Sequence, residues 1–230
     1  MKRLSFISIF ISCWFLPCSF ALPISDDFND GIIDSAIWNV STPFGQSAVL
    51  EQGGVAALIA RGGLQTVSDL PNAIEISGRF RLTHSLDNIK IAFRSDLTTT
   101  STFAELSGMI VEFNAGGGTF IAPGGGSAAS VIGNSLSTYD ANLGSFHSFR
   151  IVDDGLNIQV FLDGASTPVV WGAINHRTGQ RAAFYNREFS GLRAELDFVQ
   201  IAAVPETLPA WVNGAFVALL LAFPRRNKAL

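Results

Sequence analysis

Residues 148–164 read SFRIVDDGLNIQVFLDG, and this stretch decides the fold. Apolar and polar side chains alternate from Phe149 to Val152 and again from Leu156 to Leu162, which is the period of a strand with one buried face. Asp154-Gly155 lies between the two runs and Asp163-Gly164 follows them, and such pairs tolerate the positive φ angles of tight turns. The stretch therefore predicts two antiparallel strands joined by a tight turn.

The same alternation recurs along the chain. Further runs with a period of two lie at 73–82, 89–93, 109–113 and 192–201, whereas no run of ten or more residues before residue 204 has helical spacing. Residues 114–130 contain two runs of three glycines and are expected to form loops or hairpin tips. Many short strands between glycine-rich turns predict an all-β jelly roll, in which two antiparallel sheets pack face to face.

The hairpin at 148–164 resembles the laminin-G-like, concanavalin A-like jelly roll, in which an apolar-x-Phe-Arg-Ile strand leads into a strand that ends in Asp-Gly. Two other stretches agree with this resemblance. The opening DDFNDG at 26–31, followed by Asp34 and Trp38, is similar to the start of such secreted domains, and LRAELDFVQI at 192–201 is similar to their final strand. The resemblance implies that the first and last strands lie side by side. Residues 22–203 have the size of one such domain.

The first 21 residues have the composition of a secretory signal peptide. Lys2 and Arg3 precede an apolar stretch that ends at Leu16, and Ser19 and Ala21 supply the small side chains that a cleavage site after Ala21 requires. The alternative, a buried helix of a cytoplasmic domain, would need a polar face that this stretch lacks. Both cysteines of the chain lie in this segment, so the mature domain is expected to contain no disulfide.

The last 27 residues, 204–230, form a second apolar segment with a basic end. About sixteen residues, 208–223, are almost entirely apolar, which is near the lower limit for a membrane-spanning helix, and the basic end is expected to stay in the cytoplasm. A buried C-terminal helix is the alternative. The order of Pro205, Glu206, the apolar stretch, Arg225 and Arg226 resembles a PEP-CTERM sorting signal, although Thr207 replaces the second proline of Pro-Glu-Pro. That resemblance implies recognition by an exosortase at the inner membrane of a Gram-negative-type bacterium, and delivery to the cell surface or the extracellular matrix.

Charge argues against some partners of the domain. Residues 22–203 contain ten Lys and Arg against eighteen Asp and Glu, a net charge of −8. Nucleic acid and anionic membrane surfaces are therefore unsuitable partners. A polysaccharide or a cation is compatible with this charge.

One stretch approaches a hydrolase motif. Glycoside hydrolases occur on the same fold, and laminarinase-type members carry Glu-x-Asp-x-x-Glu on one strand. Residues 195–200 read ELDFVQ, so Gln200 stands at the position of the acid, and glutamine cannot protonate a leaving sugar oxygen. We therefore expect no catalysis, and we expect these side chains to face solvent from an edge strand.

The acidic opening is a candidate calcium site. Asp26, Asp27, Asn29, Asp30 and Asp34 offer hard oxygen ligands, of which Asp27 and Asp30 are preferred, but their spacing is not that of an EF-hand. The alternative is a turn whose side chains cap their own backbone. No other cofactor is expected.

Sugars bind proteins through aromatic faces and neighbouring planar polar groups. Candidate ligand-binding residues of these types are Trp171, Tyr139, Tyr185, Asn186, Arg187 and Arg94. Trp38 and most phenylalanines are expected in the core, and the three histidines are scattered with no nucleophile motif nearby. We expect a non-catalytic surface or matrix protein that binds a glycan or another surface component. The alternatives are a glycoside hydrolase or lyase of the same fold and a purely structural matrix protein.

Overall fold

The computed structural model describes residues 23–95, 108–123, 132–135, 138–139, 143–187 and 193–204. The expected signal peptide and the expected sorting tail beyond Val204 lie outside these residues. Within these ranges, no helix has the length and apolar character needed to cross a membrane.

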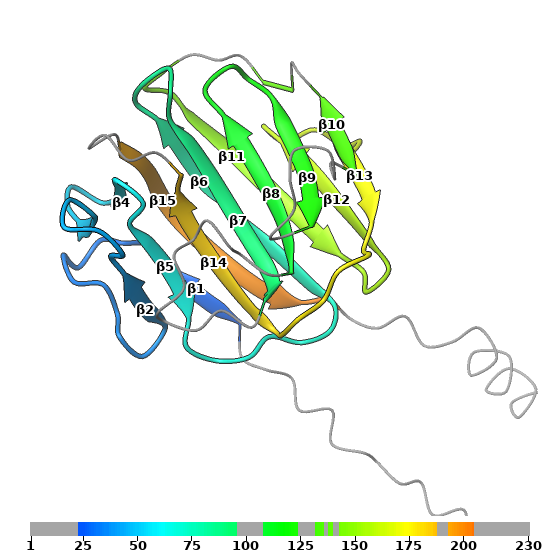
Figure 1. Cartoon of the computed structure of the whole chain (residues 1–230), viewed down its shortest axis with the longest axis horizontal. Coiled ribbons are helices and arrows are strands. Elements are labelled where there is room, and N and C mark those ends of the chain that lie inside the picture. The colour runs from blue at the N-terminus through cyan, green and yellow to red at the C-terminus, as the bar shows by residue number, and fades with distance from the viewer. Residues whose placement is uncertain are drawn as a thin grey trace, which may run out of the picture.

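The described chain forms fifteen strands in two antiparallel sheets that pack face to face (Figure 1). The eight-stranded sheet has the order β13-β12-β11-β6-β15-β4-β3, with β1 paired to β15. Its strands are β1 (Ile24–Asp26), β3 (Ala48–Glu51), β4 (Ala56–Ile59), β6 (Ile74–Leu82), β11 (Phe146–Asp153), β12 (Asn157–Leu162), β13 (Val170–Ala173) and β15 (Arg193–Ala203). The seven-stranded sheet has the order β10-β9-β8-β7-β14-β5-β2. Its strands are β2 (Trp38–Ser41), β5 (Gly63–Thr66), β7 (Asn88–Ser95), β8 (Met109–Asn114), β9 (Thr119–Pro123), β10 (Gly133–Ser135) and β14 (Arg181–Asn186).

The all-β, two-sheet prediction is confirmed, and the hairpin at 148–164 forms β11 and β12, with Phe149 opposite Leu162. In the glycine-rich segment 114–130, residues 115–118 form the expected hairpin tip, between β8 and β9. The segment also contains the strand β9, which was not expected, because Thr119 and Ile121 alternate with Phe120 and can bury one face. One expectation was wrong. The final strand, β15, is not an edge strand, because β6 pairs with one side of it while β4 and β1 pair with the other.

Aromatic side chains from both sheets fill the space between them. Phe80 of β6 stacks on Phe113 of β8, with ring centroids 4.7 Å apart and an interplanar angle of 11°. Phe149 of β11 lies 5.8 Å from the same Phe113 ring. Trp38, which is 2 % exposed, meets the Phe184 ring edge-on at 5.7 Å. The two contacts of Phe113 join the sheets, whereas Trp38 and Phe184 both belong to the seven-stranded sheet, and each pair of aromatic rings adds about 1 kcal/mol beyond the area it buries.

The first and last strands lie side by side, as the resemblance implied. Ile24 pairs with Ile201 and Asp26 pairs with Val199. The Asp26 carboxylate also accepts a hydrogen bond of 2.7 Å from the indole nitrogen of Trp38. The start of the domain is therefore fastened both to its last strand and to its core.

A buried ion pair closes one end of the sandwich. Arg94, the seventh residue of β7, donates from Nε and Nη2 to the carboxylate of Asp153 at the end of β11, and the Nη2 to Oδ1 distance is 2.8 Å. The two side chains are 6 % and 1 % exposed. Arg94 adopts a φ of 54°, a left-handed conformation that is unfavourable for a residue with a β-carbon. The pair thus links the two sheets through their inner surfaces.

Asp153→Ala is expected to lower the free energy of unfolding by about 3–5 kcal/mol, because it leaves the buried Arg94 guanidinium without its counter-charge. Chemical denaturation monitored by tryptophan fluorescence measures this change. The control is Glu75→Ala, which breaks the half-exposed 3.4 Å pair with Arg150 and should cost at most about 1 kcal/mol. Equal losses in the two variants would contradict the structural role given to Asp153.

Candidate functional site on the seven-stranded sheet

A charged pair lies in the middle of the outer face of the seven-stranded sheet. Ile89 and Ile91 of β7 face the core, so Lys90 between them faces outward, and the same alternation turns Glu112 of β8 outward. The two residues are direct cross-strand partners, and Lys90 Nζ lies 2.9 Å from Glu112 Oε2. Their side chains are 17 % and 18 % exposed, so both charges are accessible but partly shielded from water.

Tyr185 continues this row on the next strand. It pairs with Lys90 across β14 and β7, while Gly63 of β5 is its partner on the other side. Tyr185 is 3 % exposed, and burial raises the pKa of its phenol well above the ordinary value. The nearby Glu112 carboxylate raises this pKa further, whereas the Arg187 and Arg61 guanidinium groups lower it. The phenol therefore remains protonated at neutral pH.

Two arginines complete the group. Arg187 follows β14 and is 56 % exposed at its side chain, with Nη1 3.9 Å from Glu112 Oε1. Arg61 donates from Nε to the backbone oxygen of Arg187 at 2.9 Å, and its guanidinium lies 5.4 Å from the Phe44 ring centroid. We call Lys90, Glu112, Tyr185, Arg187 and Arg61 the Glu112 cluster. It gathers three cations around one carboxylate on a domain whose net charge is −8.

Small and apolar residues lie beside the Glu112 cluster. Ala183, Ala92 and Ile110 occupy consecutive strands in one register row. With Tyr185, they form a small apolar cluster on the outer side of the sheet, separate from the main core. Ala92 and Ala183 are fully buried and Tyr185 is 3 % exposed, so this apolar cluster lies below the protein surface beside the charged side chains.

The chemistry of the cluster suits hydrogen bonding more than hydrolysis. Its ammonium and guanidinium groups are donors, its carboxylate is an acceptor and its phenol can be either. Among the outward positions that the structure describes on this sheet, Glu112 is the single carboxylate. Glycoside hydrolysis generally needs two carboxylates facing each other across the bond that is cleaved.

The structure places the other predicted ligand-binding residues elsewhere. Arg94 is engaged by Asp153, and Asn186 is fully buried and donates to the Leu58 backbone oxygen at 3.3 Å. Tyr139 donates to the Asn114 backbone oxygen and packs edge-on against Phe80, and burial raises its pKa. Trp171 lies on the outer face of the opposite sheet, 67 % exposed. Of the six candidates, only Tyr185 and Arg187 are therefore brought together.

The ELDFVQ stretch faces solvent only in part, because Gln200 is exposed as expected and Asp197 is half-buried, but Glu195 is not exposed. Glu195 has a side chain only 3 % exposed, paired with both Arg81 and Arg193. Asp197 sits at a register shift in β15 and pairs with Arg79 at 2.7 Å. Because β15 is an interior strand, these acids are neutralised by arginines on their own and the adjacent strand.

The acidic opening folds mainly as a series of turns. Asp26, Asp30 and Asp34 each accept a hydrogen bond from the backbone N–H two residues ahead, at 2.8–3.0 Å. This is the capping alternative, and it begins at Asp26, the last residue of β1. Within the described ranges no three acidic, histidine or cysteine side chains are grouped to hold a metal ion. Calcium binding by Asp27 and Asp30 stays a prediction.

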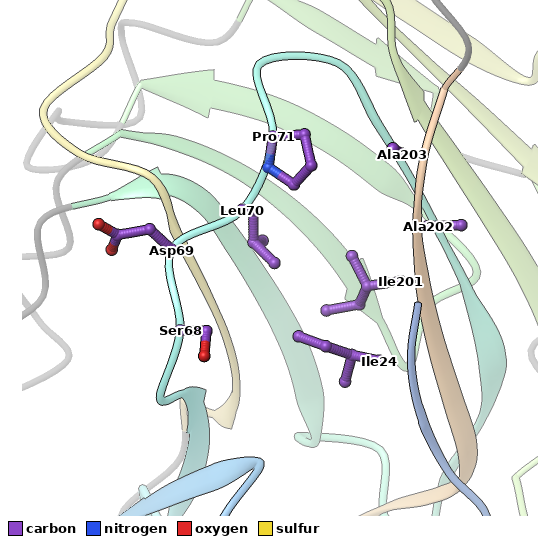
Figure 2. A pocket seen from close by; sticks show the side chains of 8 residues that line it. All are labelled: Ile24, Ser68, Asp69, Leu70, Pro71, Ile201, Ala202 and Ala203. Atoms are coloured by element: carbon purple, nitrogen blue, oxygen red, sulfur yellow. The ribbon is translucent and has the colours of Figure 1, made fainter. Parts of the chain in front are cut away.

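A pocket of about 300 Å³ lies at the end of the sandwich where β1 meets β15 (Figure 2). Leu70 and Pro71 line one side, Ile24 and Ile201 line the other, and the Asp69 carboxylate points away. Its lining is almost entirely apolar, so it offers few hydrogen-bond partners to a hydroxyl-rich ligand. We therefore do not place the site there.

Comparison with known proteins shows the fold. No protein-family model matches the chain, and no curated protein matches it. A Bacillus subtilis protein of unknown function with a galectin-like fold superposes with a TM-score of 0.58 at 9 % identity, covering 72 % of this chain and 89 % of its own. The Ca²⁺-bound exoplasmic/lumenal domain of VIP36 superposes with a TM-score of 0.57 at 9 % identity, covering 76 % of this chain and 86 % of its own. A β-1,3-glucanase from Mycobacterium marinum superposes with a TM-score of 0.53 at 12 % identity, covering 77 % of this chain and 97 % of its own. The chain is thus a galectin-like, concanavalin A-like β-sandwich.

Tyr185→Ala and Trp171→Ala are expected to differ sharply in stability. Loss of the buried Tyr185 ring should lower the free energy of unfolding by about 3 kcal/mol, whereas loss of the exposed Trp171 ring should change it by about 0.5 kcal/mol or less. Thermal and urea unfolding of both variants provide the measurement. A Trp171→Ala variant as unstable as Tyr185→Ala would mean that Trp171 belongs to the core.

Proposed function

We propose that the domain binds, without catalysis, a glycan that carries acidic groups, on the outer face of its seven-stranded sheet. The observation that carries the proposal is the Glu112 cluster, because it concentrates positive charge and directed donors on an acidic domain. Guanidinium groups bind carboxylates and sulfates through paired hydrogen bonds, and Glu112 can accept hydrogen bonds from sugar hydroxyls.

Neighbours of the same fold are consistent with a carbohydrate ligand. The VIP36 domain has also been solved in a Ca²⁺/Man2-bound form, and the Mycobacterium marinum protein is named as a β-1,3-glucanase. These two proteins indicate that the sandwich accommodates sugars both with and without hydrolysis. For this chain, the single described carboxylate at the cluster supports binding over catalysis.

Arg187→Ala and Lys90→Gln are each expected to weaken binding of a uronic-acid polysaccharide, such as alginate, about tenfold. The reason is that a hydrogen bond to a charged group contributes about 1.5 kcal/mol. Affinity electrophoresis and calorimetry with the full chain in a mild detergent measure this, and binding should weaken as salt rises. The matched control is Arg177→Ala, an exposed arginine outside the cluster, which should bind like the unmodified protein.

Three outcomes would redirect the proposal. If the protein binds no acidic polysaccharide, or if Arg187→Ala binds it as well as the unmodified protein does, the proposal is wrong and a structural matrix protein is favoured. Release of reducing sugar from the bound polymer would make the protein a hydrolase. Binding that disappears with EDTA would transfer the role to a calcium site, with Asp27 and Asp30 the first residues to replace.

The proposal also includes export, so that binding takes place outside the cytoplasm. Its support is sequence alone: the signal-like segment 1–21 and the tail with Pro205, Glu206, Arg225 and Arg226. An exosortase would release the tail and pass the domain to the cell surface or the extracellular matrix.

The mature protein is expected to begin at Leu22, and mass spectrometry of its N-terminus checks this. Ala21→Leu should block cleavage, because signal peptidase admits only small side chains at this position. Deleting the exosortase gene of the host should move the protein from the medium to the membrane fraction. An unprocessed protein in the cytosolic fraction would contradict export.

A further inference from the structure

The outer face of the opposite, eight-stranded sheet contains a second hollow, with a volume of about 380 Å³. Side chains of four adjacent strands, β12, β11, β6 and β15, surround it together with the turn after β12. Its lining consists of Ser77, Gly78, Ser148, Phe149, Arg150, Phe161, Gly164, Ala165 and Phe198. We call it the Phe161 hollow.

The strand register explains why the hollow exists. Phe161, Arg150 and Ser77 occupy one row across β12, β11 and β6. In the next row, Ser148 lies on β11 and Phe198 lies on β15, two strands away. Arg79 of β6 stands between Ser148 and Phe198 in that row. Neighbouring strands are about 4.8 Å apart, so the short side chains of Ser77 and Ser148, at diagonal positions beside the two arginines, leave a depression with Phe161 and Phe198 at its ends.

The groups around the hollow match those that hold a sugar ring. The Arg150 guanidinium lies 3.8 Å from the centroid of the Phe161 ring, and its Nη1 is 3.4 Å from Glu75. These two contacts hold a planar donor at the rim, beside the hydroxyls of Ser77 and Ser148. Arg150 covers the Phe161 ring, which is 7 % exposed, so a pyranose would place its C–H face against the half-buried Phe198 ring while its hydroxyls bond to these groups.

An exposed tryptophan lies on the same face. Trp171 of β13 pairs with Gln159 of β12, which is two residues before Phe161, so both aromatic side chains point outward. Diagonal positions on neighbouring strands are about 7–8 Å apart. The indole is 67 % exposed and lies on an edge strand, where it can stack on a sugar next to the one in the hollow.

The charges on this face are nearly matched, with four arginines against three carboxylates, whereas the Glu112 cluster has three cations and one carboxylate. Arg79 pairs with Asp197, Arg81 and Arg193 pair with Glu195, and Arg150 pairs with Glu75. With each described arginine of the face next to a carboxylate, little potential remains to attract an anion. The hollow therefore suits an uncharged ligand.

We propose that the Phe161 hollow and Trp171 form a second binding site, which takes a neutral polysaccharide chain. The domain would then bind two chemically different polysaccharides on opposite faces of one sandwich. This inference goes beyond the proposed function and does not depend on it, because it uses other residues and another class of glycan.

The test measures binding of the full chain in mild detergent to neutral polymers, namely a β-1,3-glucan, a β-1,4-glucan, a mannan and a galactan. Ser77→Trp should fill the hollow and abolish retention on the polymer that binds. Trp171→Ala should weaken binding of that polymer about fivefold to tenfold, which is the effect of losing one aromatic contact. The controls Leu50→Trp and Leu50→Ala alter an exposed residue at the other edge of the same sheet and should change nothing.

Arg187→Ala separates the two sites, because it should leave neutral-polymer binding unchanged while it weakens alginate binding. Retention of no neutral polymer, or equal retention by Ser77→Trp and Trp171→Ala, would overturn the second site whether or not alginate binds. A dimer in light scattering that Trp171→Ala dissociates would overturn it as well, since a second copy of the chain would then cover this face. Should Ser77→Trp fail to fold, Trp171→Ala decides alone.

Discussion

The contact of Phe80 and Phe113 across the two sheets is the interaction on which the rest of the structure depends. It can form only if Phe80 of β6 and Phe113 of β8 both point inward. Because side chains alternate along a strand, this requirement decides which face each of the other residues of β6 and β8 occupies. Glu112 precedes Phe113, so it must point outward, and Arg79 and Arg81 flank Phe80 and must do the same. The packing of the core therefore decides which charges are available on each outer surface.

The two outer faces use their charges differently. On the eight-stranded sheet, four arginines pair with three carboxylates of the same or the adjacent strand and cover Phe146 and Phe161, so this face is charged but nearly balanced. On the seven-stranded sheet, Lys90 and Arg187 share the single described carboxylate, Glu112. Arg61 lies beside Arg187 and adds a third positive charge. The net charge of −8 belongs to the whole domain and does not predict the charge of either outer face. The Glu112 cluster has a local excess of positive charge on an acidic domain.

Sequence reasoning found the strands that alternate regularly and missed those that do not. β6, β8 and β11 follow a period of two because one of their faces is buried and the other is not. Residues 56–59 read AALI, and three of these four residues are buried, so alternation could not reveal β4. For the site, Tyr185 and Arg187 were predicted from side-chain type, but Lys90 and Glu112 were overlooked. Alternation alone shows that they face outward, yet only the pairing of β14, β7 and β8 brings them into one row. Strand order is a property of the whole chain, and the alternation within single strands does not reveal it.

The pairing of β15 with its neighbours also has a mechanical consequence. A force applied at Val204 enters the domain through β15, which is hydrogen-bonded to β6 along one side and to β4 and β1 along the other. Pulling this strand along its axis would have to shear many hydrogen bonds at once, rather than open them one after another as in a peeled edge strand. A domain held by its C-terminal end would thus resist extension.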